Sequence, residues 1–469
     1  MSRPSSPFVP LAICAAFALA AVSNTAAAFK YWNVADTSKV PATLTATGAF
    51  TSVATGKLIP EAHPYEVNSP LWSDDAHKTR WILLPPGKSV VFSEKNDYWV
   101  YPDSAVFIKE FDIDTIPGDS TSRRRWETRF LINKREVIDT ATMQKSDHWY
   151  GFTYRWNATG TEGTYVGKYS VNDSIRVYPK GRGTAAKMKK WTFPAEQCSQ
   201  CHSSAMNDTT HARSVLGFFT AQLNRPMLGK PGVNQLDSLF KLNVLTGTKP
   251  ASWANSPRWR AIDDSTASVN VRARSYLASN CSGCHGERAN ANAIAGQCRW
   301  LADYHVMNDS LYDFRHQYSR PFNGMDTLLP QFYPVTDKGN NPRGYNALVV
   351  GAELIVPGYP LKSAIIQRQI ARDTFPGFYD PLPDQMPPVG TFEANMPAIA
   401  LLSKWVEAYP ATPAQGWDDS LNSNVGIHAR ANPAGAGLVF KGDRILVLPE
   451  NTKAGTRVTM SSLDGKNIP

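Results

Sequence analysis

The five-residue pattern Cys-x-x-Cys-His occurs twice in this chain, at residues 198–202 and again at residues 281–285. Residues three apart lie on one face of a helical turn, so two cysteines at this spacing reach the same edge of one flat ligand. The histidine that follows directly can point its imidazole at the centre of that ligand. The pattern therefore predicts covalent haem attachment, with the histidine as the proximal iron ligand.

Two copies of the motif predict two haem c groups. The predicted attachment residues and proximal ligands are Cys198, Cys201 and His202 for the first, and Cys281, Cys284 and His285 for the second. One alternative is a zinc site to which each motif contributes half, and another is a redox dithiol. A dithiol oxidoreductase usually has a βαβ context, which this sequence lacks, and two full copies of the motif favour haem.

The first 28 residues have the composition of a leader. An apolar run at residues 8–22 is followed by small residues at Ala26 and Ala28, which predicts a secretory signal peptide over 1–28, cut before Phe29. An N-terminal membrane anchor is the alternative, but the run is short for a membrane span and the cleavage site follows at once. We therefore expect export to the periplasm, the cell surface or the medium, with no transmembrane anchor.

Export changes the meaning of the 6 cysteines. Cys14 is expected to leave with the leader, four cysteines belong to the two motifs, and Cys298 remains. An odd number of cysteines in a chain of this length does not indicate a disulfide scaffold. We expect Cys298 to be a buried free thiol.

Between residues 29 and 190, β-branched and aromatic runs alternate with Gly, Pro, Asn and Asp, which predicts short strands. The runs are RWILL, SVVF, AVFIKEF, WETRFLI, WYGFTYRW and SIRVY. We expect a multidomain chain that begins with an all-β, sandwich-like domain over 29–190. A mainly α di-haem region is expected to follow over 191–410.

Downstream of the second motif, Met386 stands in the proline-rich stretch DPLPDQMPPVG. A rigid loop of this kind can hold a thioether over a haem iron, so we expect Met386 to be the distal ligand of the second haem. One alternative is that Met386 is a core-filling methionine. Met396 is the nearest rival, although it lies at the edge of the following helix.

Helical patterns flank the second motif and Met386. The lead-in VRARSYLASN offers Tyr276 and Leu277 to a core, and the segment MPAIALLSKWVEAY puts Ile399, Leu402 and Val406 on one apolar stripe. The order NCSGCHG, VPGYPLKSAI, QMPP and LLSKWVEA resembles a class I cytochrome c domain. This resemblance places such a domain at about residues 268–410.

The distal ligand of the first haem is not evident from the sequence. His211, Met227, Met307 and Met325 are all candidates, whereas Met206 is too close to His202 to reach the opposite face. An iron without a protein ligand at this position would permit ligand binding or peroxide chemistry.

A wider resemblance covers roughly residues 60–410. The segments NSPLWSDDAHKTRWILLPPGKSVVF, ETRFLI, GFTYRWN, FPAEQCSQCH, TAQLNRP and RARSYLASNCSGCHG are similar to a bacterial family of secreted di-haem c-type cytochromes. Members join an N-terminal β-rich region to a C-terminal cytochrome c domain and are often encoded near parallel β-helix proteins. The resemblance implies redox partner proteins, with a parallel β-helix protein as one candidate. Ala278 departs from the bulkier residue of the family, which implies a more open haem edge.

The composition shifts again after Tyr409. Residues 411–437 are rich in Pro, Gly, Ala and Asn, which predicts a linker. Residues 438–469 alternate as short strands with turns at Gly442–Asp443 and Asp464–Gly465. This β tail resembles the small tails that sort some bacterial proteins across the outer membrane, and an ordinary β extension is the alternative.

The formal net charge is +9, with basic clusters at 123–125 and 187–190 that could dock an acidic redox partner or serve only solubility. No nucleic-acid-binding module is present. We expect an exported di-haem electron-transfer protein, a carrier rather than a catalyst. The alternatives are a di-haem peroxidase or dehydrogenase with an open first haem, and a β-domain that binds a substrate or surface and uses the haems as its electron outlet.

Overall fold

The computed structural model describes residues 29, 34, 36–93, 99–195, 198, 202, 215–285, 355, 358–372, 385–387 and 390–408, together with the backbone of four short strands between 438 and 468. The helical elements are η1 (Thr37–Lys39), α1 (Leu44–Thr47), η2 (Ser120–Ser122), α3 (Thr220–Leu223), α4 (Gln235–Lys241), α5 (Val269–His285), η3 (Pro360–Lys362), α8 (Ala364–Ile370) and α9 (Met396–Glu407). The strands are β1 (Phe50–Ser52), β2 (Lys57–Leu58), β3 (His63–Pro64), β4 (His77–Leu83), β5 (Val90–Val91), β6 (Val106–Asp114), β7 (Arg123–Asp139), β8 (Gln144–Trp156), β9 (Gly163–Tyr165), β10 (Val171–Val177), β11 (Lys187–Phe193), β12 (Pro226–Met227), β13 (Lys230–Asn234), β14 (Leu245–Thr246), β15 (Leu438–Lys441), β16 (Arg444–Val447), β17 (Met460–Ser461) and β18 (Asn467–Ile468).

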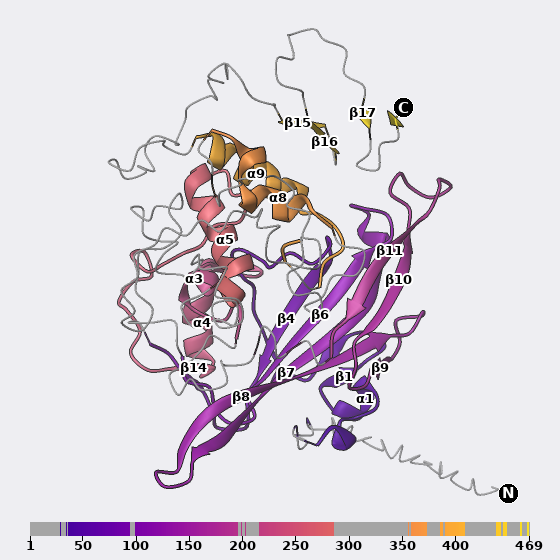
Figure 1. The fold of residues 1–469 in the computed structure, drawn as a ribbon. Coiled ribbons are helices and arrows are strands. Elements are labelled where there is room, and N and C mark those ends of the chain that lie inside the picture. The colour runs from indigo at the N-terminus through magenta and orange to yellow at the C-terminus, as the bar shows by residue number, and fades with distance from the viewer. Residues whose placement is uncertain are drawn as a thin grey trace, which may run out of the picture.

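A 6-stranded antiparallel sheet in the order β3-β4-β6-β7-β8-β9 organises the fold (Figure 1). The β-branched and aromatic runs fall within β4, β5, β6, β7, β8 and β10, so the strand-rich prediction for this region is confirmed. Among the described residues, no second sheet of this size faces the first, because the other sheets have only two strands each. The result is a mixed, sheet-rich fold with few helices.

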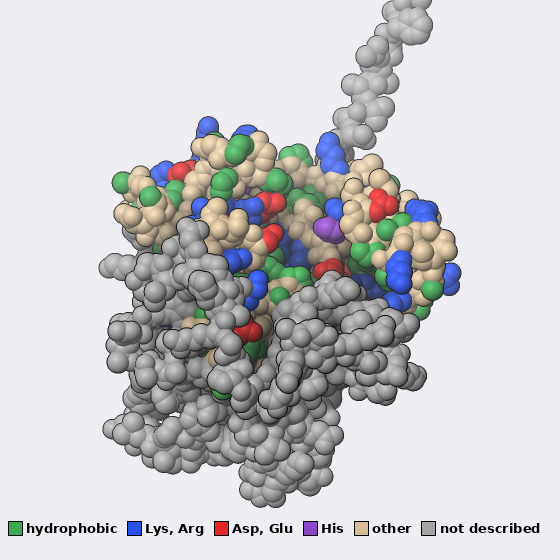
Figure 2. All heavy atoms as spheres, turned by 90° about the horizontal axis from the view of Figure 1, so that it is seen from above, with side chains coloured by type: hydrophobic (Ala, Val, Ile, Leu, Met, Phe, Trp, Pro, Cys, Tyr) green, Lys and Arg blue, Asp and Glu red, His purple; other side chains and the backbone are tan. Residues whose placement is uncertain are grey.

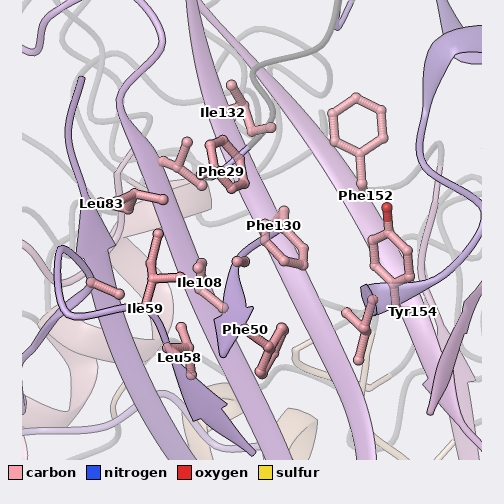
Figure 3. Packing of buried hydrophobic residues seen from close by; sticks show 14 of the residues in the cluster. Phe29, Phe50, Leu58, Ile59, Leu83, Ile108, Phe130, Ile132, Phe152 and Tyr154 are labelled. Atoms are coloured by element: carbon pink, nitrogen blue, oxygen red, sulfur yellow. The ribbon is translucent and has the colours of Figure 1, made fainter. Parts of the chain in front are cut away.

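The N-terminal segment covers one face of the sheet. Figure 3 shows Phe29, Phe50, Leu58 and Ile59 packed against inward-facing side chains of the central strands. Those side chains include Leu83, Ile108, Phe130, Ile132, Phe152 and Tyr154. The strands alternate because successive side chains point to opposite faces, so each strand supplies every second residue to this core.

The opposite face carries two separate apolar clusters. At one end, Phe107 and Trp149 pack with residues from 215–253, including Phe218 and Leu236. At the other end, Phe111 and Ile113 of β6 and Trp126 of β7 pack with Trp191 and Phe193 of the β10–β11 ribbon. Phe218 and Leu236 help to cover this face, although both lie beyond residue 190, where the β-rich domain was expected to end. The core of the sheet therefore includes part of the segment that was expected to belong to the di-haem region.

The helices α5, α8 and α9 share a core with Phe219 and Trp259. Trp405 of α9 is fully buried, and its indole Nε1 donates to Asn270 Oδ1 of α5 at 2.9 Å. The expected core positions on these helices are confirmed, since Tyr276, Leu277, Ile399, Leu402 and Val406 are all buried. Truncation of a buried tryptophan to alanine costs about 3–5 kcal/mol, so this contact fixes α9 to α5.

The C-terminal strands form two hairpins, β15–β16 and β17–β18, around the two expected turns. The expected leader at 1–28 and linker at 411–437 lie outside the described residues. In the part of the chain that the structure describes, no helix combines the length and the apolar character needed to cross a bilayer.

The carboxylate of Glu110 is buried in the sheet, where a negative charge is unfavourable. Glu110 of β6 is 7% exposed, with Arg125 Nε 3.7 Å from its Oε1. Burial, and then the nearby charge of Asp112, raise the pKa of Glu110 to about 7. A carboxyl whose pKa is raised on folding binds more protons in the native state than in the unfolded state. The stability of the fold therefore decreases as the carboxyl ionises, between about pH 4.5 and about pH 7.

We therefore predict that Glu110→Gln, which stays neutral, raises the free energy of unfolding at pH 8 by on the order of 2 kcal/mol and changes it little at pH 4. Urea unfolding at the two pH values measures the difference. Glu61→Gln, at an exposed position, is the matched control. An equal effect of Glu110→Gln at both pH values would contradict the assignment.

Candidate functional site

The second Cys-x-x-Cys-His motif forms the C-terminal end of α5. The helix places Cys281 and Cys284 one turn apart on the same face, as the spacing predicts, and His285 is its last residue. The same face continues back to Leu277, which is fully buried in the helical core. The motif is therefore presented by a helix whose other end is fixed by packing.

The Cys281 thiol is partly buried at the edge of this core and forms no disulfide. Burial raises the pKa of Cys281 to about 12. Redox dithiols and zinc ligands require a thiolate and usually have a lowered thiol pKa. A raised thiol pKa does not favour the thiolate that a redox dithiol would use.

Met386 lies in a short segment beside α8. Its backbone N–H donates to the carbonyl oxygen of Arg368 at 2.7 Å. The neighbouring Gln385 is fully buried and donates through Nε2 to the carbonyl oxygens of Pro387 and Thr391, both at 2.9 Å. The bond to Arg368 ties the Met386 segment to α8, and the Gln385 bonds fix the turn that follows Met386. The helix α8 packs with α9, and α9 packs with α5. Met396 is the first residue of α9 and packs against the helical core.

A loop between β3 and β4 joins the helices to the sheet. The hydroxyls of Ser69 and Ser279 are 2.9 Å apart, and the Trp72 backbone N–H donates to Asn280 Oδ1 at 2.7 Å. These contacts reach α5 directly before the second motif. Sequence analysis missed this loop as part of the site, because the polar residues of SPLWSDD resemble an ordinary turn.

The same loop also holds the segment between Met386 and α9. Asp74 accepts from the backbone N–H groups of Phe392 and Glu393 at 2.9 and 3.0 Å, and Trp72 Nε1 donates to the Glu393 carbonyl oxygen at 2.8 Å. Lys189 of β11 forms an ion pair with the Glu393 carboxylate. The loop 69–75, defined here as the bridging loop, therefore contacts both the part of α5 directly before the second motif and the segment directly before α9.

The first motif lies over strand β8. A Cβ atom added to Gly151 would come within 2.5 Å of Cys198 Sγ, so the absence of a side chain at Gly151 makes room for Cys198. The Cys198 backbone N–H donates to the Ala195 carbonyl oxygen at 3.2 Å, and His202 is half-buried. The glycine in the run WYGFTYRW was the available sequence signal for a close approach at this strand.

The remaining predicted site residues are placed only in part. Met227 lies in β12, in a short hairpin with β13, and is half-buried. Cys201, His211, Cys298, Met307 and Met325 lie outside the described residues, as does Met206. For Cys284 and His285 the structure describes the helix backbone and not the side chains.

The basic clusters expected to form a docking face have partners within the chain. Arg123 Nε pairs with Asp114 at 2.8 Å, and Lys189 pairs with Glu393. Lys190 lies over the ring of Phe392, with Nζ 5.9 Å from the ring centre. These contacts hold loops to the sheet. A docking role for the two basic clusters stays a prediction.

The chain matches no family model, no curated protein and no solved structure. Within the described ranges, no group of three or more His, Cys, Asp and Glu side chains is arranged to hold a metal ion. The interpretation of the two motifs therefore depends on their own chemistry and on the surroundings described above.

We predict that Gly151→Ala lowers the free energy of unfolding by about 1–3 kcal/mol, because the new methyl group would overlap Cys198. In protein made without haem attachment, adding Cys198→Gly removes the opposing side chain and should restore most of this loss, and thermal or urea unfolding measures both steps. Gly232→Ala is the control, since nothing lies within 4 Å of a Cβ at that position. A loss that Cys198→Gly fails to restore would mean that the two residues are not in contact.

Proposed function

We propose that this protein is an exported di-haem c-type cytochrome that transfers electrons through two covalently bound haems. The observation that carries the proposal is the end of α5, where Cys281, Cys284 and His285 complete the attachment motif on a helix fixed by buried packing. Bound haem would supply a one-electron Fe(III)/Fe(II) couple, and the chain would set its potential, its position and its access to water.

The residues of the second site fit a haem. Cys281 presents a partly buried thiol with a raised pKa at the edge of an apolar core, and the helix supplies Cys284 one turn further on. Tyr276 and Leu277 extend the apolar surface on the same helix. Such a surface excludes water from a porphyrin and favours a defined orientation.

The residues of the first site fit in a different way. Gly151 gives Cys198 a place directly against a β-strand, so the first attachment site would be held by the sheet and the second by a helix. His202 and His285 would be the proximal iron ligands, and Met386 the distal ligand of the second haem. The bridging loop would hold the second site in a fixed relation to the sheet, and so to the first.

At the level of domains, we propose that residues 268–410 form the class I-like cytochrome c unit within a di-haem region over 191–410. The hydrogen bonds of the bridging loop join that unit to the β-rich part over 29–190, so the two would move together rather than as independent modules. The leader at 1–28 would direct export, and the β tail at 438–469 would be a sorting segment or a plain extension. Redox partner proteins, a parallel β-helix protein among them, remain partners implied by resemblance.

Replacement of Met386 tests its role as a ligand. A thioether sulfur favours Fe(II) and raises the midpoint potential relative to a nitrogen ligand, so Met386→His should clearly lower one of the two midpoint potentials. A spectroelectrochemical redox titration measures both midpoints. Met396→Leu, at the rival methionine, should leave both nearly unchanged. If Met386→His moves neither midpoint, Met386 is a packing residue.

A carrier and an enzyme differ in their response to peroxide. The sequence around Cys198 does not resemble an acid–base pair that could break an O–O bond, so we predict that peroxide reoxidises the reduced protein once without sustained turnover. A steady-state assay with an excess of reducing donor measures this. Sustained peroxide consumption that disappears in His202→Ala would instead favour a peroxidase with an open first haem. That outcome would overturn the carrier proposal.

A further inference from the structure

Three basic residues occupy one row across the middle of the main sheet. The strand register pairs Arg80 of β4 with Lys109 of β6, and Lys109 with Arg129 of β7. Directly paired residues share a face of an antiparallel sheet, with Cβ atoms about 5 Å apart. Like charges placed opposite each other are destabilising, so this row, called here the cation row, needs a compensating anion.

The described residues supply only part of that compensation. Arg129 donates through Nε and Nη2 to the two carboxylate oxygens of Glu127 at 2.6 and 2.9 Å. Trp191 Nε1 also donates to Glu127 Oε2, at 2.8 Å, so both oxygens of this carboxylate already accept hydrogen bonds from other residues. Within the part of the chain that the structure describes, neither Arg80 nor Lys109 forms an ion pair.

Among the residues of the cation row, the unbalanced positive charge has its largest effect on the pKa of Lys109. Burial, followed by the charges of Arg80, Lys78 and Arg129, holds the pKa of Lys109 well below its usual range, and Glu127 opposes this only in part. The Lys109 ammonium lies 4.8 Å from the ring centre of Phe111. A weak cation–π contact does not offset the burial of an ammonium between two other cations.

The cation row lies beside the first attachment motif. Gly151, the residue that faces Cys198, pairs with Leu131, and Leu131 pairs with Phe107. These residues form the next row on the same sheet face, about 7 Å along the strands from the cation row. Lys109 is two strands away from β8, which corresponds to about 10 Å across the sheet. Figure 2 shows basic and acidic side chains gathered around a hollow in the described surface.

We propose that the cation row is a carboxylate-binding site, and that its ligands are the propionates of the haem attached at Cys198 and Cys201. The inference rests on the proposed function. A haem c is held at its vinyl edge by the cysteines, and its two propionates project from the opposite edge. A carboxylate pair between Arg80, Lys109 and Arg129 would turn mutual repulsion into charge-assisted hydrogen bonds. Attachment of the haem would thus bring the negative charges that neutralise the cation row.

The test is the effect of Lys109→Met in two backgrounds, compared by thermal unfolding. One background is the full protein made in a host that matures c-type cytochromes, and the other also carries Cys198→Ala and Cys201→Ala. We expect Lys109→Met to lower Tm by a few degrees in the first background and to raise it in the second, because only the first contains the propionates. Arg80→Met should show the same reversal of sign.

A second readout is the midpoint potential of the first haem. A nearby cation favours the reduced iron, which carries one positive charge less, so Lys109→Met should lower the first midpoint and leave the second unchanged. Lys134→Met removes the same charge from β7 at a position where the alternation points the side chain to the other sheet face. It should not reverse the sign of the Tm change or move the first midpoint.

The outcomes separate the two proposals. If the haem content of the full protein is zero, the proposed function fails, and this inference fails with it. If two haems are attached but Lys109→Met shifts Tm in the same direction in both backgrounds, the propionate assignment alone is wrong, and a carboxylate of the chain neutralises the row. If added succinate stabilises only the variant without Cys198 and Cys201, in proportion to its concentration, the row binds carboxylates as proposed.

Discussion

The hydrogen bonds of the bridging loop hold the two parts of this protein together. Asp74 accepts two backbone N–H groups from the segment before α9, and Trp72 bonds both to that segment and to Asn280 of α5. Burial raises the pKa of Asp74 to about 6, although the two bonds from Phe392 and Glu393 oppose the shift. The two bonds offset part of the cost of burying this carboxylate, and they join the bridging loop to a segment more than 300 residues away in the sequence. Without these bonds, α5 and α9 would still pack on each other and on Phe219, but their direct hydrogen bonds to the bridging loop would be lost.

This arrangement places the two Cys-x-x-Cys-His motifs on different kinds of support. Cys198 lies against Gly151 of β8. Cys281 lies in the C-terminal part of α5, which is packed through the buried Leu277 and bonded to Trp405 through Asn270. A sheet and a helix that are joined by hydrogen bonds at several points make a rigid pair. Rigid spacing is what an electron carrier with two centres requires, since the protein's contribution is to position cofactors and tune their surroundings.

Much of the local structure was predictable from the sequence, and most of the long-range structure was not. Runs such as AVFIKEF and WETRFLI are strands because β-branched and aromatic residues fit a pleated, half-buried surface. The stripe of Ile399, Leu402 and Val406 identified α9 for a similar reason. The pairing of Arg80, Lys109 and Arg129 depends on register, which alternation within single strands does not determine. The role of the bridging loop depends on partners such as Asn280 and Phe392 that are hundreds of positions away in the chain.

Covalent haem attachment at both motifs is measured directly by intact-mass spectrometry of the denatured protein. Protein from a host that matures c-type cytochromes should have the mass of the processed chain plus two haems. The Cys198→Ala/Cys201→Ala and Cys281→Ala/Cys284→Ala variants should each lose one haem. A mass equal to that of the bare chain, or the recovery of bound zinc in place of haem, would contradict the account.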